Sequence, residues 1–199
     1  MRAILMLLIV LPTVGVTAAH CQLDYYARVG ATVATKLLTD DVIQEVETHQ
    51  AIAPTLFLGV ALPIAPTYST SLEASLTSSG YHSTEQGVDT DLGTLRTGSI
   101  LLSLAGPVWR RIAWRAGFGL IRYFPGEEEG IFLRGGTTRF LAGAGVDYRP
   151  SLLSGWDLMV SLRYDFHRFT TAELKARGFT GGQSVQRVSA SLGLARARP

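Results

Sequence analysis

Cysteine is nearly absent from the chain, because Cys21 is the only one among its 199 residues. A single thiol allows neither an intramolecular disulfide nor a two-cysteine metal site. An excess of one charge is absent too, since 18 Lys and Arg residues stand against 16 Asp and Glu residues. Such a balance gives no reason to expect nucleic acid as a partner. We therefore expect no metal and no cofactor, and the composition excludes a disulfide scaffold and a basic nucleic-acid binder.

Long apolar runs are absent except at the N-terminus. There, Arg2 precedes an apolar stretch over residues 4–10 and small residues at 17–19, the order found in a cleaved secretory signal. The apolar stretch ends at Pro12, short of the roughly 18 to 20 residues that the alternative, a single-pass anchor, requires. We expect residues 1–19 to be a signal peptide and residues 20–199 to form one domain.

Cys21 lies close behind the expected cleavage site, where lipoproteins carry a lipidated cysteine. His20, however, occupies the position at which lipoprotein signals have a small residue. The sequence leaves open whether Cys21 carries a lipid.

Apolar residues of the mature chain alternate with small or charged ones, in the period of two that β-strands show. The clearest segment is 156–167, where Trp, Leu, Val, Leu, Tyr and Phe occupy every second position. Most segments have the roughly 9 to 11 residues with which a tilted strand crosses a membrane. Eight segments follow this pattern: 24–34, 55–64, 68–79, 95–105, 111–123, 139–148, 156–167 and 187–194.

The connections between these segments alternate in length. Long ones cover 35–53, 80–92, 125–136 and 170–183, and shorter ones cover 63–67, 106–110 and 150–155. This alternation is typical of an up-and-down membrane barrel. In the first long connection, Asp40 can cap a short helix that carries Val42, Ile43 and Val46.

A soluble barrel of the lipocalin kind is the alternative to a membrane barrel. Such a barrel turns its apolar face inward and shows water a face rich in Lys, Glu and Thr. Here the second face holds Gly, Ser and Ala with Arg and Asp, and lysine is nearly absent from it, which suits a narrow lumen. A closed barrel also satisfies every backbone group within the bilayer. The sequence therefore predicts an all-β fold, an eight-stranded antiparallel up-and-down transmembrane β-barrel.

Segments such as LAGAGVDYRP and LMVSLRYDFHRF, together with the signal and the loop rhythm, resemble small outer-membrane barrels of the OmpA, OmpX and OmpW kind. The resemblance covers nearly the whole mature chain and implies a location in the bacterial outer membrane. These families usually end on an aromatic residue, whereas this chain continues past Leu194, where we expect the last strand to end. Proteins of this fold anchor membranes, adhere, pass small solutes or modify lipids, so the fold alone does not assign a function.

Charged residues at inward positions of the expected strands are the first candidate site. Buried charges of both signs must pair, so the alternatives are a salt-bridge network that plugs the lumen, a selective polar pathway, or catalysis. For catalysis, His167 with Asp165 two residues earlier could act as a base for a serine, although no pattern links it to Ser161 or Ser184. The inward set comprises Arg28, Glu73, Arg115, Arg139, Asp147, Arg163, Asp165, His167 and Arg187.

Acidic residues in the long connections are the second candidate site. They either form a solvated rim or share divalent cations with lipopolysaccharide phosphates, because hard cations prefer oxygen ligands. The acidic set comprises Asp40, Asp41, Glu45, Glu47, Glu85, Asp89, Asp91, Glu127, Glu128 and Glu129.

Our leading hypothesis is a non-enzymatic barrel with a structural or surface-interaction role; the alternatives are a narrow pore for small solutes and a lipid-modifying enzyme.

Overall fold

The computed structural model describes residues 23–196 except 41–45, 86, 128–129, 154, 177 and 179–180. The expected signal peptide, residues 1–19, and Cys21 lie outside this part. The described part contains eleven strands, one 3-10 helix and one α-helix: β1 (Asp24–Ala34), β2 (Leu38–Asp40), β3 (Val46–Gln50), β4 (Ala53–Pro63), β5 (Ser69–Glu85), β6 (Val88–Trp109), β7 (Ile112–Pro125), η1 (Gly130–Phe132), β8 (Thr138–Tyr148), β9 (Ser151–Leu153), β10 (Trp156–Phe169), α1 (Ala172–Ala176) and β11 (Gln183–Arg196).

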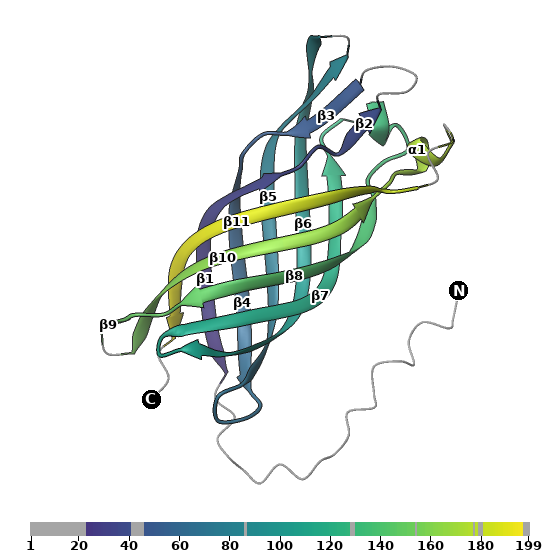
Figure 1. The fold of residues 1–199 in the computed structure, drawn as a ribbon. Helices are drawn as coiled ribbons and strands as arrows, with labels where there is room; N and C mark the ends of the chain where they lie inside the picture. The colour runs from purple at the N-terminus through teal and green to yellow at the C-terminus, as the bar shows by residue number, and fades with distance from the viewer. Residues whose placement is uncertain are drawn as a thin grey trace.

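The eight long strands close into one antiparallel ring, in the order β1, β4, β5, β6, β7, β8, β10, β11 (Figure 1). Strands that follow one another along the chain are neighbours in the ring, and β11 pairs back with β1. Val29 of β1, for example, lies opposite Leu192 of β11 and Leu56 of β4. The predicted eight-stranded up-and-down barrel is therefore confirmed.

The first long connection differs from its prediction. β2 pairs with β3, and β3 pairs with the outer part of β5, so this connection adds a hairpin to the sheet. The predicted helix is wrong at Asp40 and Val46, which lie in β2 and β3, while Val42 and Ile43 lie outside the described residues. The outer part of β5 offers backbone partners that a single isolated helical turn would lack.

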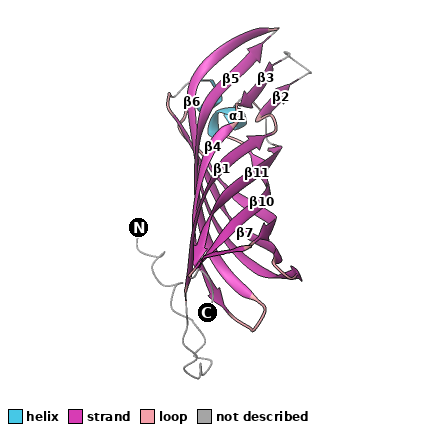
Figure 2. Cartoon of the chain, turned by 90° about the vertical axis from the view of Figure 1, so that its left-hand side faces the viewer, coloured by secondary structure: helices cyan, strands magenta, loops and turns pink. Residues whose placement is uncertain are grey.

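The second long connection also continues as strand. β5 and β6 run past the predicted ends of their segments to a turn at Gly87, whose φ of 79° suits glycine. A register shift lies between Gly80 and His82, where the hairpin leaves the ring. Figure 2 shows β5 and β6 projecting beyond the other strands.

The opposite end of the barrel carries the short turns and all three tryptophans. Trp109 ends β6, Trp156 begins β10, and Trp114 lies near the start of β7. Arg110, with a φ of 42°, forms the turn between β6 and β7 and stacks its guanidinium carbon 5.3 Å from the Trp109 ring centre. Tryptophan is typical of the membrane–water interface, so this end forms an aromatic rim.

The described part has no helix with the length and apolarity needed to span a membrane.

Candidate functional site

An ion network lies inside the barrel around Glu73 of β5, whose side chain is 0% exposed. Its carboxylate accepts hydrogen bonds from Arg115 Nη1 at 2.6 Å and from Arg163 Nη1 at 2.7 Å, and it also pairs with Arg28. The alternation of each strand turns these three arginines inward from β1, β7 and β10. One carboxylate thus joins four strands through charge-assisted hydrogen bonds.

Two further carboxylates extend this network. Asp147 accepts hydrogen bonds from Arg115 Nη2 at 3.3 Å and from the Ser161 hydroxyl at 2.6 Å. Asp165 accepts hydrogen bonds from Arg163 through Nε, at 2.7 Å and 2.9 Å to its two oxygens, and through Nη2 at 2.5 Å. The network therefore reaches from β1 across to β8, and it comprises Arg28, Glu73, Arg115, Asp147, Arg163 and Asp165.

The other three residues of the inward set lie outside this network. Arg187 is buried, and its Nη2 donates to the Thr77 hydroxyl at 3.3 Å. Arg139 is half-buried and donates through Nε to the Thr170 carbonyl at 3.0 Å. His167 is buried, and its Nε2 lies 2.6 Å from the Tyr123 hydroxyl.

The geometry around His167 does not resemble a Ser–His pair. Its hydrogen-bond partner is a tyrosine, and Nδ1 has no partner among the described residues. Ser161 is bonded to Asp147 and lies six residues away, about 20 Å along the strand. Ser184 is exposed, so it lies on the outer side of β11.

An aromatic cap fills the lumen above the ion network, toward the long loops. Tyr123 and Phe169 meet edge to face with ring centres 5.0 Å apart, and Phe132 of η1 packs on Phe169 at 5.8 Å and on Tyr81 at 5.7 Å. Leu174 of α1 joins from the last long loop. The cap comprises Leu37, Tyr81, Leu95, Leu101, Ile121, Tyr123, Ile131, Phe132, Leu141, Phe169, Leu174 and Val185.

No pattern in the sequence predicted this cap. The alternation places Leu141 on an inward face, but Tyr81 falls in a predicted long connection. Phe169 and Val185 lie just outside the predicted segments, and the members in the loops lie in segments without a period. The available signal was the presence of Ile131, Phe132 and Leu174 in connections that were otherwise polar, because solvated loops rarely need such side chains. Thr171 positions α1, since its hydroxyl accepts a hydrogen bond from the Leu174 amide at 3.1 Å.

The acidic set is spread over the long-loop end. Asp89 and Asp91 are exposed on the projecting part of β6, where they accept hydrogen bonds from the Thr84 hydroxyl at 3.0 Å and the Gly93 amide at 2.9 Å. The described residues include no group of three or more His, Cys, Asp or Glu side chains that could hold a metal ion. Glu127 is exposed after β7; Asp40, Glu47 and Glu85 lie in β2, β3 and β5; and Asp41, Glu45, Glu128 and Glu129 lie outside the described residues.

The outer wall of the barrel is apolar from rim to rim. Phe118 of β7 is 79% exposed and Phe140 of β8 is 86% exposed, and the outward positions of the other long strands carry Leu, Val, Ile and Tyr. A monomer in water rarely exposes an apolar surface that encircles it. This belt is therefore a surface for lipid.

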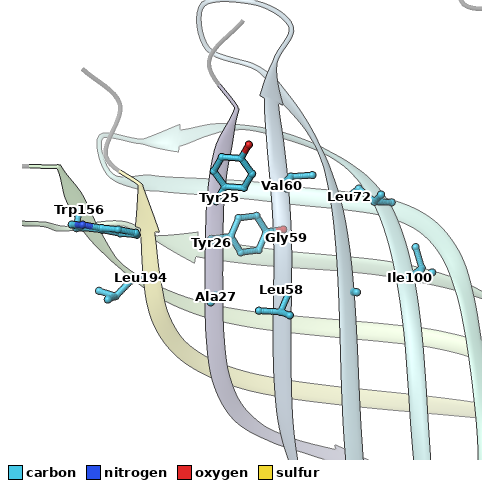
Figure 3. A pocket seen from close by; sticks show the side chains of 11 residues that line it. Tyr25, Tyr26, Ala27, Leu58, Gly59, Val60, Leu72, Ile100, Trp156 and Leu194 are labelled. Atoms are coloured by element: carbon cyan, nitrogen blue, oxygen red, sulfur yellow. The ribbon is translucent and has the colours of Figure 1, made fainter.

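The close-up in Figure 3 shows one apolar groove of this wall, about 670 Å³ in volume. Tyr25, Leu58 and Leu72 point outward around it, whereas the Tyr26 ring turns toward Gly59 on the neighbouring strand. A Cβ on Gly59 would lie 2.1 Å from the Tyr26 ring carbon Cζ. The glycine therefore makes room for this ring in the barrel wall.

A closed ring of eight strands, an apolar belt and a charged interior define the class of small transmembrane β-barrels of the bacterial outer membrane. Among solved structures, the fold resembles the Neisserial surface protein A, with 12% identity, a TM-score of 0.55 and coverage of 87% of this chain and 96% of that one. It also resembles the outer membrane protein OprG from Pseudomonas aeruginosa, with 14% identity, a TM-score of 0.53 and coverage of 89% and 96%.

A third similar structure is Ail, the attachment invasion locus protein of Yersinia pestis, solved in complex with the heparin analogue sucrose octasulfate. It is 11% identical, with a TM-score of 0.51 and coverage of 88% of this chain and 98% of that one. No protein-family model and no curated protein sequence matches the chain. The likeness is thus one of fold, and it confirms the resemblance on which the expected architecture and outer-membrane class were based.

Proposed function

We propose that this chain is a non-enzymatic outer-membrane barrel with a closed lumen, delivered by a cleaved signal peptide and acting through its outer loops at the cell surface. The observation that carries the proposal is the filling of the lumen at two levels. The ion network around Glu73 occupies one level, and the aromatic cap with Phe132 occupies the next. Eight-stranded barrels have an interior just wide enough for side chains to fill.

The surface role is supported by the hairpin of β5 and β6 that projects past the ring (Figure 2). Its two strands pair with each other, and β5 also pairs with β3, so it is regular β-structure rather than an irregular loop. The names of two similar structures, a surface protein and an attachment protein, favour the same interpretation. The hairpin is therefore the part of this barrel best suited to contact a partner.

The chemistry of the contact that we propose is lipopolysaccharide phosphate bridged by divalent cations. Asp89 and Asp91 present exposed carboxylates, and His82 Nδ1 lies 3.9 Å from Asp91 Oδ1. Two carboxylates on one strand do not complete a cation's coordination sphere, which takes about six to eight oxygen ligands for calcium. Phosphate oxygens of the lipid would supply the remainder.

A planar-bilayer recording tests the closed lumen. We expect no conductance steps from protein whose insertion is verified by a gel-mobility difference between unboiled and boiled samples. Reproducible steps from such protein would overturn the closed lumen and favour the alternative, a narrow pore for small solutes.

Binding of purified lipopolysaccharide with and without Mg²⁺ tests the outer contact. We expect the variant Asp89→Asn/Asp91→Asn to lose most of the Mg²⁺-dependent binding while keeping its strand pairing. Asp157→Asn is the matched control for the Mg²⁺-dependent part of the binding only, because it removes a carboxylate at the opposite end of the barrel. Equal Mg²⁺ dependence in all three proteins would contradict the proposal.

The proposal also predicts that His167→Ala leaves the lipid A of the host unchanged. The His167 ring pairs with Tyr123 and has no serine within hydrogen-bond distance among the described residues. Mass spectrometry of lipid A from cells with the original and the variant chain measures this. A lipid A modification that depends on His167 would favour the lipid-modifying enzyme instead.

A further inference from the structure

The short-turn end of the barrel opens into a cavity of about 500 Å³, which we call the vestibule. Small side chains and glycines from β6 and β7 line part of it, among them Ala105, Gly106 and Ala113. Short turns of such barrels face the periplasm, so the vestibule opens to that side of the membrane. Its charged lining comprises Arg110, Arg111, Arg149, Asp147 and Asp157.

At the inner end of the vestibule, the negative charge of Asp147 is already paired with an arginine. Asp147 is 1% exposed and is bonded to Arg115 and Ser161, so its charge belongs to the ion network. The same network separates the vestibule from the rest of the lumen. A ligand of the vestibule would therefore enter and leave from the periplasmic side.

The walls, in contrast, carry positive charge that no carboxylate of the described residues pairs with. Among the described residues, neither Arg110, Arg111 nor Arg149 forms a salt bridge. Arg149 Nε is buried and has no hydrogen-bond acceptor in the described part of the chain. Buried donors are nearly always satisfied by protein, water or a ligand. With Asp157 as the only other carboxylate of the lining, the three arginines leave an excess of positive charge.

We propose that the vestibule binds a phosphate group, held by Arg111 and Arg149 with Arg110 at the rim. The planar guanidinium matches the oxygens of phosphate in a bidentate manner, which makes arginine the preferred side chain for such a ligand. The volume falls within the roughly 300 to 1,000 Å³ of small-molecule sites. The phosphate comes either from solution or from the headgroup of a lipid in the inner leaflet.

The rim explains why a headgroup is one of the two sources. Trp109 is 64% exposed next to Arg110, at the level where interface aromatics meet headgroups. An anionic headgroup drawn over this rim would reach Arg110 first. The proposal concerns the opposite end from the outer hairpin, and it stands whether or not the surface role holds.

The experiment uses the mature chain, residues 20–199, labelled with ¹⁵N and refolded into octyl glucoside micelles, which contain no phosphate. Arginine Nε–Hε resonances are followed by NMR during titration with inorganic phosphate at constant ionic strength. We expect saturable shifts of the Arg111 and Arg149 resonances, with an apparent Kd on the order of millimolar. A second titration with dihexanoylphosphatidylglycerol assigns the source: tighter binding of this lipid indicates a headgroup, and tighter binding of phosphate indicates a free anion.

Variants make the test specific. Arg111→Gln/Arg149→Gln should weaken binding about tenfold or more, because hydrogen bonds between charged groups are removed. Asp157→Asn should tighten phosphate binding about threefold, since it removes a negative charge that repels the anion. Arg168→Gln, an exposed arginine at the long-loop end, is the matched control and should bind as the original chain does.

Gel mobility of unboiled samples verifies that each variant is folded. The proposal is overturned if neither probe gives saturable shifts, or if the double variant and the Arg168→Gln control respond alike. An Asp157→Asn variant that binds no more tightly than the original chain also counts against it. This last variant removes only a charge, so it keeps the test informative where the double variant does not fold.

Discussion

Glu73 is the residue on which the interior depends most. Three guanidinium groups meet on its carboxylate, and Phe57 packs between two of them, with ring-centre distances of 4.8 Å to Arg28 and 5.4 Å to Arg163. A buried ion pair contributes little more stability than an apolar pair of similar volume, because the cost of desolvating the two charges offsets their attraction. Removing one partner is different, since the charges that remain are buried without compensation.

We predict that Glu73→Gln lowers the free energy of unfolding by about 3 to 5 kcal/mol. Urea unfolding in lipid vesicles, followed by circular dichroism, measures this. Glu127→Gln is the control: the side chain is exposed, so we expect a change within about 0.5 kcal/mol. Equal effects of the two substitutions would mean that the network does not stabilise the barrel.

A second residue-scale prediction concerns the contact between Gly59 and Tyr26. Gly59→Val should cost about 1 to 3 kcal/mol, because the added atoms overlap the Tyr26 ring. In a Tyr26→Ala background the same substitution should cost clearly less. A double-mutant cycle in the same unfolding assay measures the difference, and additive effects would show that the two residues do not compete for space.

At the scale of elements, the aromatic cap shows how loops acquire a fixed place. η1 inserts Ile131 and Phe132 into the mouth, and α1 adds Leu174 beside them. Burial of a large apolar side chain contributes roughly 1.5 to 3 kcal/mol, which offsets part of the entropy lost by ordering a loop. The two long loops at the mouth are thus held from inside the barrel.

We predict that Phe132→Ala releases these loops without unfolding the barrel. Phe132 is fully buried and contacts three other rings, so its loss removes most of what holds η1. Hydrogen exchange should become faster at residues 130–135 and 171–176, while the amides of β10 and β11 keep their protection. Leu133→Ala, an exposed neighbour, should leave exchange unchanged. Global loss of protection would contradict a local role for the cap.

Sequence patterns predicted the long strands but not everything that surrounds them. Within the membrane, one face meets lipid and the other meets the lumen, so a strand such as β10 alternates between buried and exposed positions from Met159 to Phe169. Beyond Tyr81, the ends of β5 and β6 carry no apolar row, and residues 87–91 are exposed, which made residues 80–92 resemble a loop. Their pairing depends on backbone hydrogen bonds, which leave no mark in side-chain chemistry.

The inward charges could be named from the sequence, but their partners could not. Alternation determines which face a residue occupies, whereas pairing depends on the stagger of strands around the ring. Arg163 illustrates the difference, because it bonds both to Asp165 on its own strand and to Glu73 on β5. The burial of Phe132 likewise depends on the assembled barrel, because the rings that it contacts come from three different strands.

For the whole molecule, ring closure predicts resistance to detergent. Every long strand has two neighbours in the ring, so unfolding cannot begin by peeling an edge strand. We expect unboiled samples in dodecyl sulfate gels to migrate apart from boiled ones. A chain shortened before β11 loses the β1–β11 pairing and should show one position regardless of heating. A persistent shift in that shortened chain would contradict closure through β11.

The aromatic rim makes the direction of membrane insertion optically visible. Trp109, Trp114 and Trp156 are the only tryptophans in the sequence, and all lie at the short-turn end. When the chain is added to vesicles from outside and its long loops cross the bilayer, the aromatic rim stays in the outer leaflet of the vesicle. Acrylamide added outside should then continue to quench the fluorescence, whereas a barrel inserted the other way would hide its entire signal in the vesicle interior.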